Sequence, residues 1–162
     1  DQLNIGNRGI YFSLFTLASI ATRFFAGKMA DKVGRVPVIK VSIFIIIASM
    51  ITFSQANDAT WFYLGSIIFG FGIGIFFPAI TAWSIDLGLE NKRGRAMATM
   101  YIALEIAIGS GAFISGTFVG SDLQRIPLLF YFSAILCILG LCYIYHFDSN
   151  KIYNLIKKIV TK

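Results

Sequence analysis

The chain has 162 residues, of which 57% are hydrophobic and only 14% are charged. Soluble domains carry about 25% charged residues, so this composition excludes a soluble globular protein and indicates an integral membrane chain. The formal net charge of +6 does not indicate nucleic-acid binding. Most lysines and arginines fall in two short connections and the C-terminal tail, and all three are expected on one side of a membrane. The expected partner of this charge is an anionic lipid leaflet.

Five apolar runs of membrane-spanning length follow one another along the chain. They predict an all-α membrane protein, a bundle over residues 1–147 with transmembrane helices at about 9–27, 37–55, 61–85, 96–119 and 127–146. The second and fifth runs hold few small or polar features, and we expect them to face lipid. Residues 148–162 place apolar side chains at helical spacing among four lysines, which predicts a basic amphipathic tail on the cytoplasmic leaflet.

The first two runs are joined by the charged segment 27–35, which is predicted to be a short hinge. Its lysines and arginine place it on the cytoplasmic side, whereas residues 54–60 contain neither type and are expected outside. The N-terminus is then outside and the C-terminus cytoplasmic. Arg23 lies inside the first run, close to its cytoplasmic end. Its side chain either extends to the interface or pairs with an acidic group of this segment or of a neighbouring helix.

The third run carries Gly70 and Gly74, a G-x-x-x-G pair that lets two helices approach closely. Pro78 removes one backbone hydrogen bond and predicts a kink. Transporters place gates and substrate contacts at such interruptions, so these residues are cavity candidates. The alternative is a tight structural crossing without substrate contact. Asp86, near the cytoplasmic end of this helix, is a further candidate and opens a second cytoplasmic connection.

Glu105 lies about nine residues, hence about 13.5 Å, into the fourth helix. It is the only acidic residue predicted to lie so deep in the membrane. An acidic side chain at a helix centre costs roughly 2.5–3.5 kcal/mol, and facing a cavity or a partner offsets that cost. Glu105 is therefore the candidate for proton coupling. The alternative is a protonated glutamate that hydrogen-bonds a neighbouring helix.

No set of side chains indicates catalysis, a metal or another cofactor. Cys137 and Cys142 share one apolar run, which suits packed or lipid-facing thiols rather than a disulfide. His146 has no second ligand nearby in the sequence. Paired catalytic acids and nucleophile–base sets are not found, so we do not expect an enzyme.

The segment from Gly27 to Arg35 fits the pattern G-x-x-x-D-[RK]-x-G-R at Gly27, Asp31, Lys32, Gly34 and Arg35. It resembles the signature loop of the major facilitator superfamily of secondary transporters. Members have twelve helices in two halves of six, and this loop joins the second and third helices of a half. The resemblance implies that the chain is part of a larger transporter and matches helices two to six of one half. Residues 111–116 lack the proline and one glycine of a G-P-x-x-G-G motif, which favours the C-terminal half, helices eight to twelve.

The resemblance also implies a mechanism of alternating access. The two halves rock around a central small-molecule site, which here implies proton-coupled efflux of a drug-like or sugar-like compound across a bacterial inner membrane. Asp31 and Arg35 are then expected at the cytoplasmic gate. There Asp31 would bind the N-terminal end of a helix in the missing N-terminal half. The competing reading is a truncated membrane protein that does not transport, or a scaffold that binds other helices.

Overall fold

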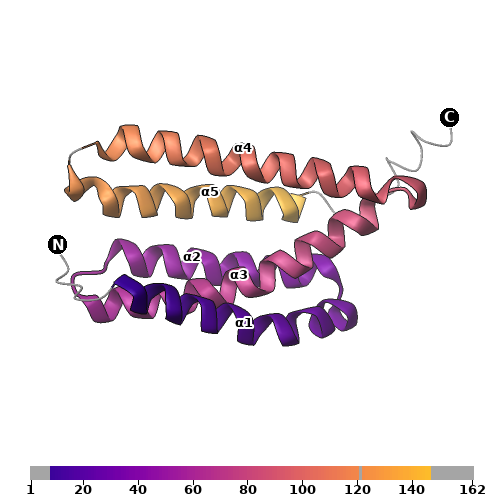
Figure 1. The fold of residues 1–162 in the computed structure, drawn as a ribbon, viewed down its shortest axis with the longest axis horizontal. Helices are drawn as coiled ribbons and strands as arrows, with labels where there is room; N and C mark the ends of the chain where they lie inside the picture. Colours follow the sequence, from indigo (N-terminus) through magenta and orange to yellow (C-terminus); the bar gives the residue numbers. More distant parts are fainter. Residues whose placement is uncertain (1–7, 121, 147–162) are drawn as a thin grey trace.

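The structure, a computed structural model, describes residues 8–120 and 122–146 (Figure 1). In these ranges the chain forms five long helices: α1 (Arg8–Val33), α2 (Arg35–Ser54), α3 (Ala59–Leu87), α4 (Arg93–Val119) and α5 (Ile126–His146). Short 3-10 turns, Glu90–Lys92 and Leu123–Arg125, precede α4 and α5. All five helices are long and apolar enough to cross a membrane, and the described ranges contain no strand. The predicted all-α membrane fold is confirmed, whereas the tail predicted at 148–162 lies outside the described residues.

The connection between α1 and α2 differs from the predicted hinge. Residues 27–33 continue α1, and Gly34 alone lies between the two helices, with φ of 99°. Charged and small residues such as those of 27–33 are compatible with helix, so α1 extends beyond the apolar run. The positive φ favours glycine at position 34. Pro37 falls in the first turn of α2, where its missing N–H is harmless.

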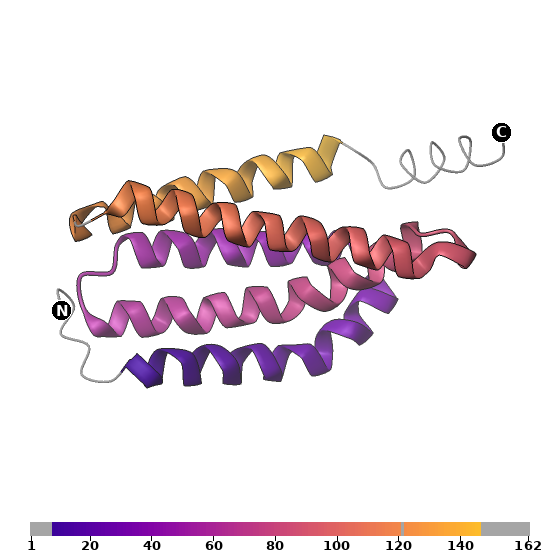
Figure 2. The same ribbon diagram turned by 45° about the horizontal axis from the view of Figure 1, so that its top comes forward.

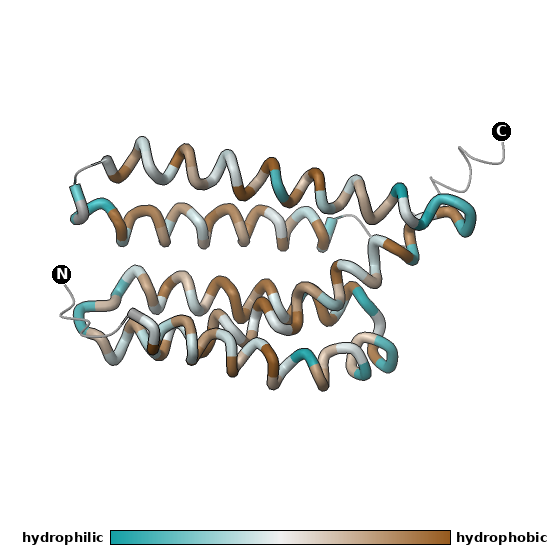
Figure 3. Tube along the Cα trace, in the orientation of Figure 1, coloured by the Kyte–Doolittle hydropathy of each residue, from teal (hydrophilic) through white to brown (hydrophobic). Residues whose placement is uncertain are grey.

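The helices alternate in direction. The α1–α2 reversal and the α3–α4 connection lie at one end of the molecule, and the other two connections lie at the opposite end (Figure 1). Figure 3 shows that hydrophilic positions gather mainly at these two ends. The first end holds six basic residues, Lys28, Lys32, Arg35, Lys92, Arg93 and Arg95. The described chain is therefore a multi-pass membrane protein with a strongly basic end.

Helix α3 occupies the centre of the packing, between α1 and α2. A Cβ atom added at Gly70 would lie 2.5 Å from the Phe15 carbonyl oxygen of α1. One added at Gly72 would lie 2.7 Å from Cγ1 of Ile46 in α2. Because real Cβ atoms do not approach so closely, the glycines of α3 are what allow this double contact.

Helix α2 is the most buried of the five, packed against α3 on one side and α5 on another. Ile39 is 1% exposed, and Ser42 and Ser49 are buried and donate to carbonyls of their own helix at 2.7 Å. The expectation that this helix mainly faces lipid was therefore wrong. Only the stripe with Val41 and Phe44 remains strongly exposed.

Helix α4 stands apart from this packing. It contacts the C-terminal end of α3 and the start of α5, and none of its residues is buried. Figure 1 shows it at the edge of the molecule, and both views show it connected to α3 at one end and to α5 at the other.

Candidate functional site

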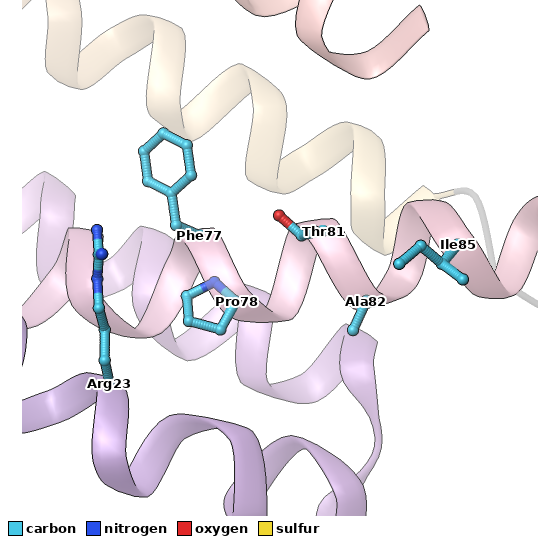
Figure 4. Close-up of a pocket in the computed structure, with 6 residues that line it drawn as sticks. All are labelled: Arg23, Phe77, Pro78, Thr81, Ala82 and Ile85. Carbon is cyan, nitrogen blue, oxygen red and sulfur yellow. The ribbon is translucent and has the colours of Figure 1, made fainter. Parts of the chain in front are cut away.

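A groove opens between α1 and α3 in the half of the bundle nearer the basic end (Figure 4). Its volume is about 330 Å³, and six residues line it: Arg23, Phe77, Pro78, Thr81, Ala82 and Ile85. One guanidinium and one hydroxyl are thus set among apolar walls. The groove is open on one side rather than enclosed.

The groove begins where the close crossing of α1 and α3 ends. A Cβ atom added at Gly74 would lie 2.0 Å from Oγ1 of Thr22 and 2.6 Å from the Ser19 carbonyl oxygen. Arg23, which directly follows Thr22, and Pro78, four residues after Gly74, already belong to the groove wall. Because Pro78 lacks an N–H, the continuous helix α3 cannot form one backbone hydrogen bond at this level, and Figure 1 shows the later part of α3 inclined toward α4. The structure therefore brings Gly70, Gly74, Pro78 and Arg23 together in one region.

Arg23 is exposed and makes no ion pair or hydrogen bond with any residue in the described ranges. Figure 4 shows its side chain reaching from α1 to α3 beside Phe77 and Pro78. The Cα–Cβ bonds of a helix tilt toward its N-terminus. The Cα–Cβ bond of Arg23 therefore points away from the basic end of the bundle, although that end is the nearer one. The side chain lies along the groove, and an acidic partner for it is not found among the described residues. Extension of Arg23 to the interface and pairing with an acidic group elsewhere both stay predictions.

A second cluster ties three helices together at the basic end. Arg35 of α2 donates from Nη1 to Asp31 of α1, and from Nε to Oδ2 of Asp86 in α3 at 3.2 Å. Asp31 thus has a partner within the described chain. Its binding to a helix end in another half stays a prediction. Gly27 and Lys32 do not join the cluster. A Cβ atom at Gly27 would meet nothing within 4 Å, and Lys32 is exposed.

Glu105 lies apart from both groups. It is exposed near the middle of α4 and has no hydrogen-bonding or ionic partner in the described part of the chain. Cβ atoms added at Gly109 and Gly111, one turn further along, would also meet nothing within 4 Å. The small-residue surface of α4 is therefore uncovered by the helices described.

Several contributors to these sites were not predicted. Phe77, Thr81 and Ile85 follow one another at intervals of four residues. This spacing places them on one face of α3, and the sequence could have indicated that face once Pro78 was singled out. The ammonium of Lys40 lies 3.9 Å from the ring centre of Tyr145, a link between α2 and α5 that no sequence spacing reveals. No group of three histidine, cysteine or acidic residues within the described ranges could hold a metal ion.

Comparison with protein families matches residues 3–153 to the Major Facilitator Superfamily. The chain belongs to this family. Multidrug resistance protein 2 of Bacillus subtilis is 28% identical over 119 residues, which are 71% of this chain and 30% of that protein. Quinolone resistance protein NorA of Staphylococcus aureus is 24% identical over 132 residues, 82% of this chain and 33% of that protein.

A plant relative is similar over a comparable stretch. Sugar transporter ERD6 of Arabidopsis thaliana is 26% identical over 118 residues, which are 73% of this chain and 24% of that protein. The chain thus spans between 24% and 33% of the length of these relatives.

Proposed function

We propose that this superfamily chain supplies five helices of a secondary active transporter that exports a small molecule in exchange for protons. In that protein the chain corresponds to helices eight to twelve, and the N-terminal half packs against it. Membership of the family supports transport. Drug-like or sugar-like compounds are the proposed cargo, because the relatives are named for multidrug resistance, quinolone resistance and sugar transport. The proposed location is a bacterial inner membrane, with the basic end cytoplasmic.

The observation that carries the proposal is Glu105 on the uncovered helix α4. A carboxyl group at mid-helix is costly against lipid, whereas a polar cavity between two halves offsets that cost. In such a cavity Glu105 takes up a proton from one side and releases it to the other as access alternates. The groove at Arg23 opens on another part of the same bundle and is proposed to contribute to the cargo site.

The test is Glu105→Gln in the full-length transporter, because glutamine keeps the size and removes the titrating group. We expect transport driven by a pH gradient to fail, while exchange of cargo without a gradient survives. Glu90→Gln, in the exposed turn before α4, is the matched control and should behave as the parent. If Glu105→Gln concentrates cargo against a gradient as well as the parent does, Glu105 is not the coupling residue. Absence of any transport by the parent would favour a non-transporting scaffold.

Orientation is tested separately. Cys137 and Cys142 are first replaced by serine, and a single cysteine is then placed at Lys32 or Asn57, at opposite ends of the bundle. An impermeant thiol reagent applied to intact cells should label position 57 and not position 32. Labelling of position 32 would reverse the proposed orientation.

A further inference from the structure

We propose that the groove between α1 and α3 binds the acidic group of the cargo, so that the transported molecule is a small organic anion with an apolar body. This inference rests on the proposed function and specifies its substrate class. Arg23 and Thr81 would hold a carboxylate, and the apolar lining residues would contact the remainder of the molecule.

The charge of the groove is the first support. Among the described residues that line it, Arg23 alone carries a charge. The acidic residues of the two flanking helices, Asp31 of α1 and Asp86 of α3, both interact with Arg35. The guanidinium is thus uncompensated within the described chain, and its planar set of donors matches the two oxygens of a carboxylate.

Thr81 provides a second donor. The two serines of α3, Ser66 and Ser84, donate to carbonyls of their own helix at 2.8 Å. Thr81 makes no hydrogen bond to a residue in the described ranges, and Figure 4 shows its oxygen on the same side of α3 as Phe77. A hydroxyl without an internal partner in an apolar groove favours a ligand with an acceptor.

The lining of the groove indicates the chemistry of the rest of the cargo. Phe77, Pro78, Ala82 and Ile85 offer one aromatic and several aliphatic surfaces. A volume of about 330 Å³ lies at the low end of the 300–1,000 Å³ typical of small-molecule sites. These features suit a cargo whose body is aromatic or aliphatic.

The test measures equilibrium binding to the purified full-length transporter by titration calorimetry, without any gradient. The probes are two matched pairs, benzoate with benzamide and 1-naphthoate with 1-naphthamide. Each acid should bind at least about tenfold more tightly than its amide, as expected for a charge-assisted, bidentate contact. Arg23→Gln should bring the ratio near one while leaving amide affinity unchanged. Arg23→Lys should keep part of the preference, because a lysine retains the charge and loses the fork.

Two further variants complete the design. Thr81→Val keeps the shape and should lower acid affinity about threefold, which tests the site even if Arg23→Gln fails to fold. Lys28→Gln, an exposed cation of α1 outside the groove, should retain the full preference. Equal binding of acids and amides by the parent, or absence of binding by either, overturns the inference. An acid preference that survives Arg23→Gln unchanged also overturns it, since Arg23 would then serve only to pair with a carboxylate elsewhere in the protein. An acid preference that survives Thr81→Val unchanged overturns it as well.

The two proposals fail in different ways. Because binding needs no gradient, an acid preference in a protein that does not transport would contradict the proposed function alone. Transport by a protein without this preference would contradict the inference alone.

Discussion

Helices α3 and α4 have similar lengths, 29 and 27 residues, and both are apolar and rich in glycine. Their packing is nevertheless opposite. Cβ atoms at Gly70, Gly72 and Gly74 of α3 would collide with α1 or α2, whereas those at Gly109 and Gly111 of α4 would meet nothing. Lipid is as apolar as a helix surface, so small residues stabilise a membrane helix only where a partner uses the space they leave. The comparison therefore separates a helix whose partners are in the described chain from one whose small-residue face is uncovered.

The largest expected effect comes from filling the close crossing. Gly74→Leu forces a side chain into Thr22 and Ser19, and we expect a loss of stability on the order of 3 kcal/mol or more, seen as loss of folded full-length protein in size-exclusion chromatography. Gly109→Leu is the matched change on α4. It should leave the folded amount near normal and lower transport, because it fills the face proposed to line the central cavity. An equal loss of fold in both variants would remove the contrast between the helices.

A second pair of variants removes side chains instead of adding them. Ile39 is 1% exposed and Ile106 is 65% exposed. Ile39→Ala should cost about 1–3 kcal/mol in thermal or denaturant unfolding of the detergent-solubilised protein, through lost packing contacts. Ile106→Ala should change stability by less than about 0.5 kcal/mol. A reversed order would show that α4 carries more of the packing than α2.

The charge cluster gives a smaller effect, and on rate more than on stability. Asp31→Asn removes the charge of one of the two carboxylates that Arg35 contacts, while leaving Asp86 in place. Exposed ion pairs contribute about 0.2–1 kcal/mol, so we expect initial transport rates to fall no more than several-fold, at normal expression. Asp122→Asn is the control, because its ion pair with Arg125 spans only three residues and lies in the connection between α4 and α5, at the opposite end of the bundle. Unchanged rates in Asp31→Asn would exclude a role in the gate.

The smallest effect is expected at the link between α2 and α5. Lys40→Gln removes the cation over the Tyr145 ring and should lower the free energy of unfolding by about 0.5 kcal/mol. Lys28→Gln, at an exposed position of α1, should have no measurable effect on unfolding. A loss as large as that of Ile39→Ala would mean that α5 depends on this contact more than on its apolar packing.

Much of this architecture could be predicted from the sequence, because spanning helices are long apolar runs. The number of helices and the G-x-x-x-G crossing at Gly70 and Gly74 followed from residue type and spacing alone. The end of α1 did not, since the charged residues after Ala26 suggest a loop although they are compatible with helix. The burial of α2 could not be predicted either, because apolar side chains suit contact with lipid and contact with protein equally well.

The candidate sites were predictable to different degrees. Arg35 was singled out, but its contact with Asp86 joins residues 51 positions apart in the chain and depends on the tertiary packing. Arg23 was noted for its depth, whereas the groove it enters needed the relative placement of α1 and α3. The coupling role of Glu105 remains a prediction, since none of the described residues forms a hydrogen bond or ion pair with it.

Gly34 has a mechanical consequence. A connection of one residue holds the Cα atoms on either side of it within about 8 Å of each other, so α1 and α2 have no slack at this end. The Gly34 N–H also donates to the Ala30 carbonyl oxygen at 3.1 Å, which stiffens the vertex further. The two helices are therefore joined by a short, stiff connection. We expect a tilt of α1 to be transmitted directly to α2. Inserting a few flexible residues at Gly34 would uncouple the motions of α1 and α2 without altering the sequence of either helix.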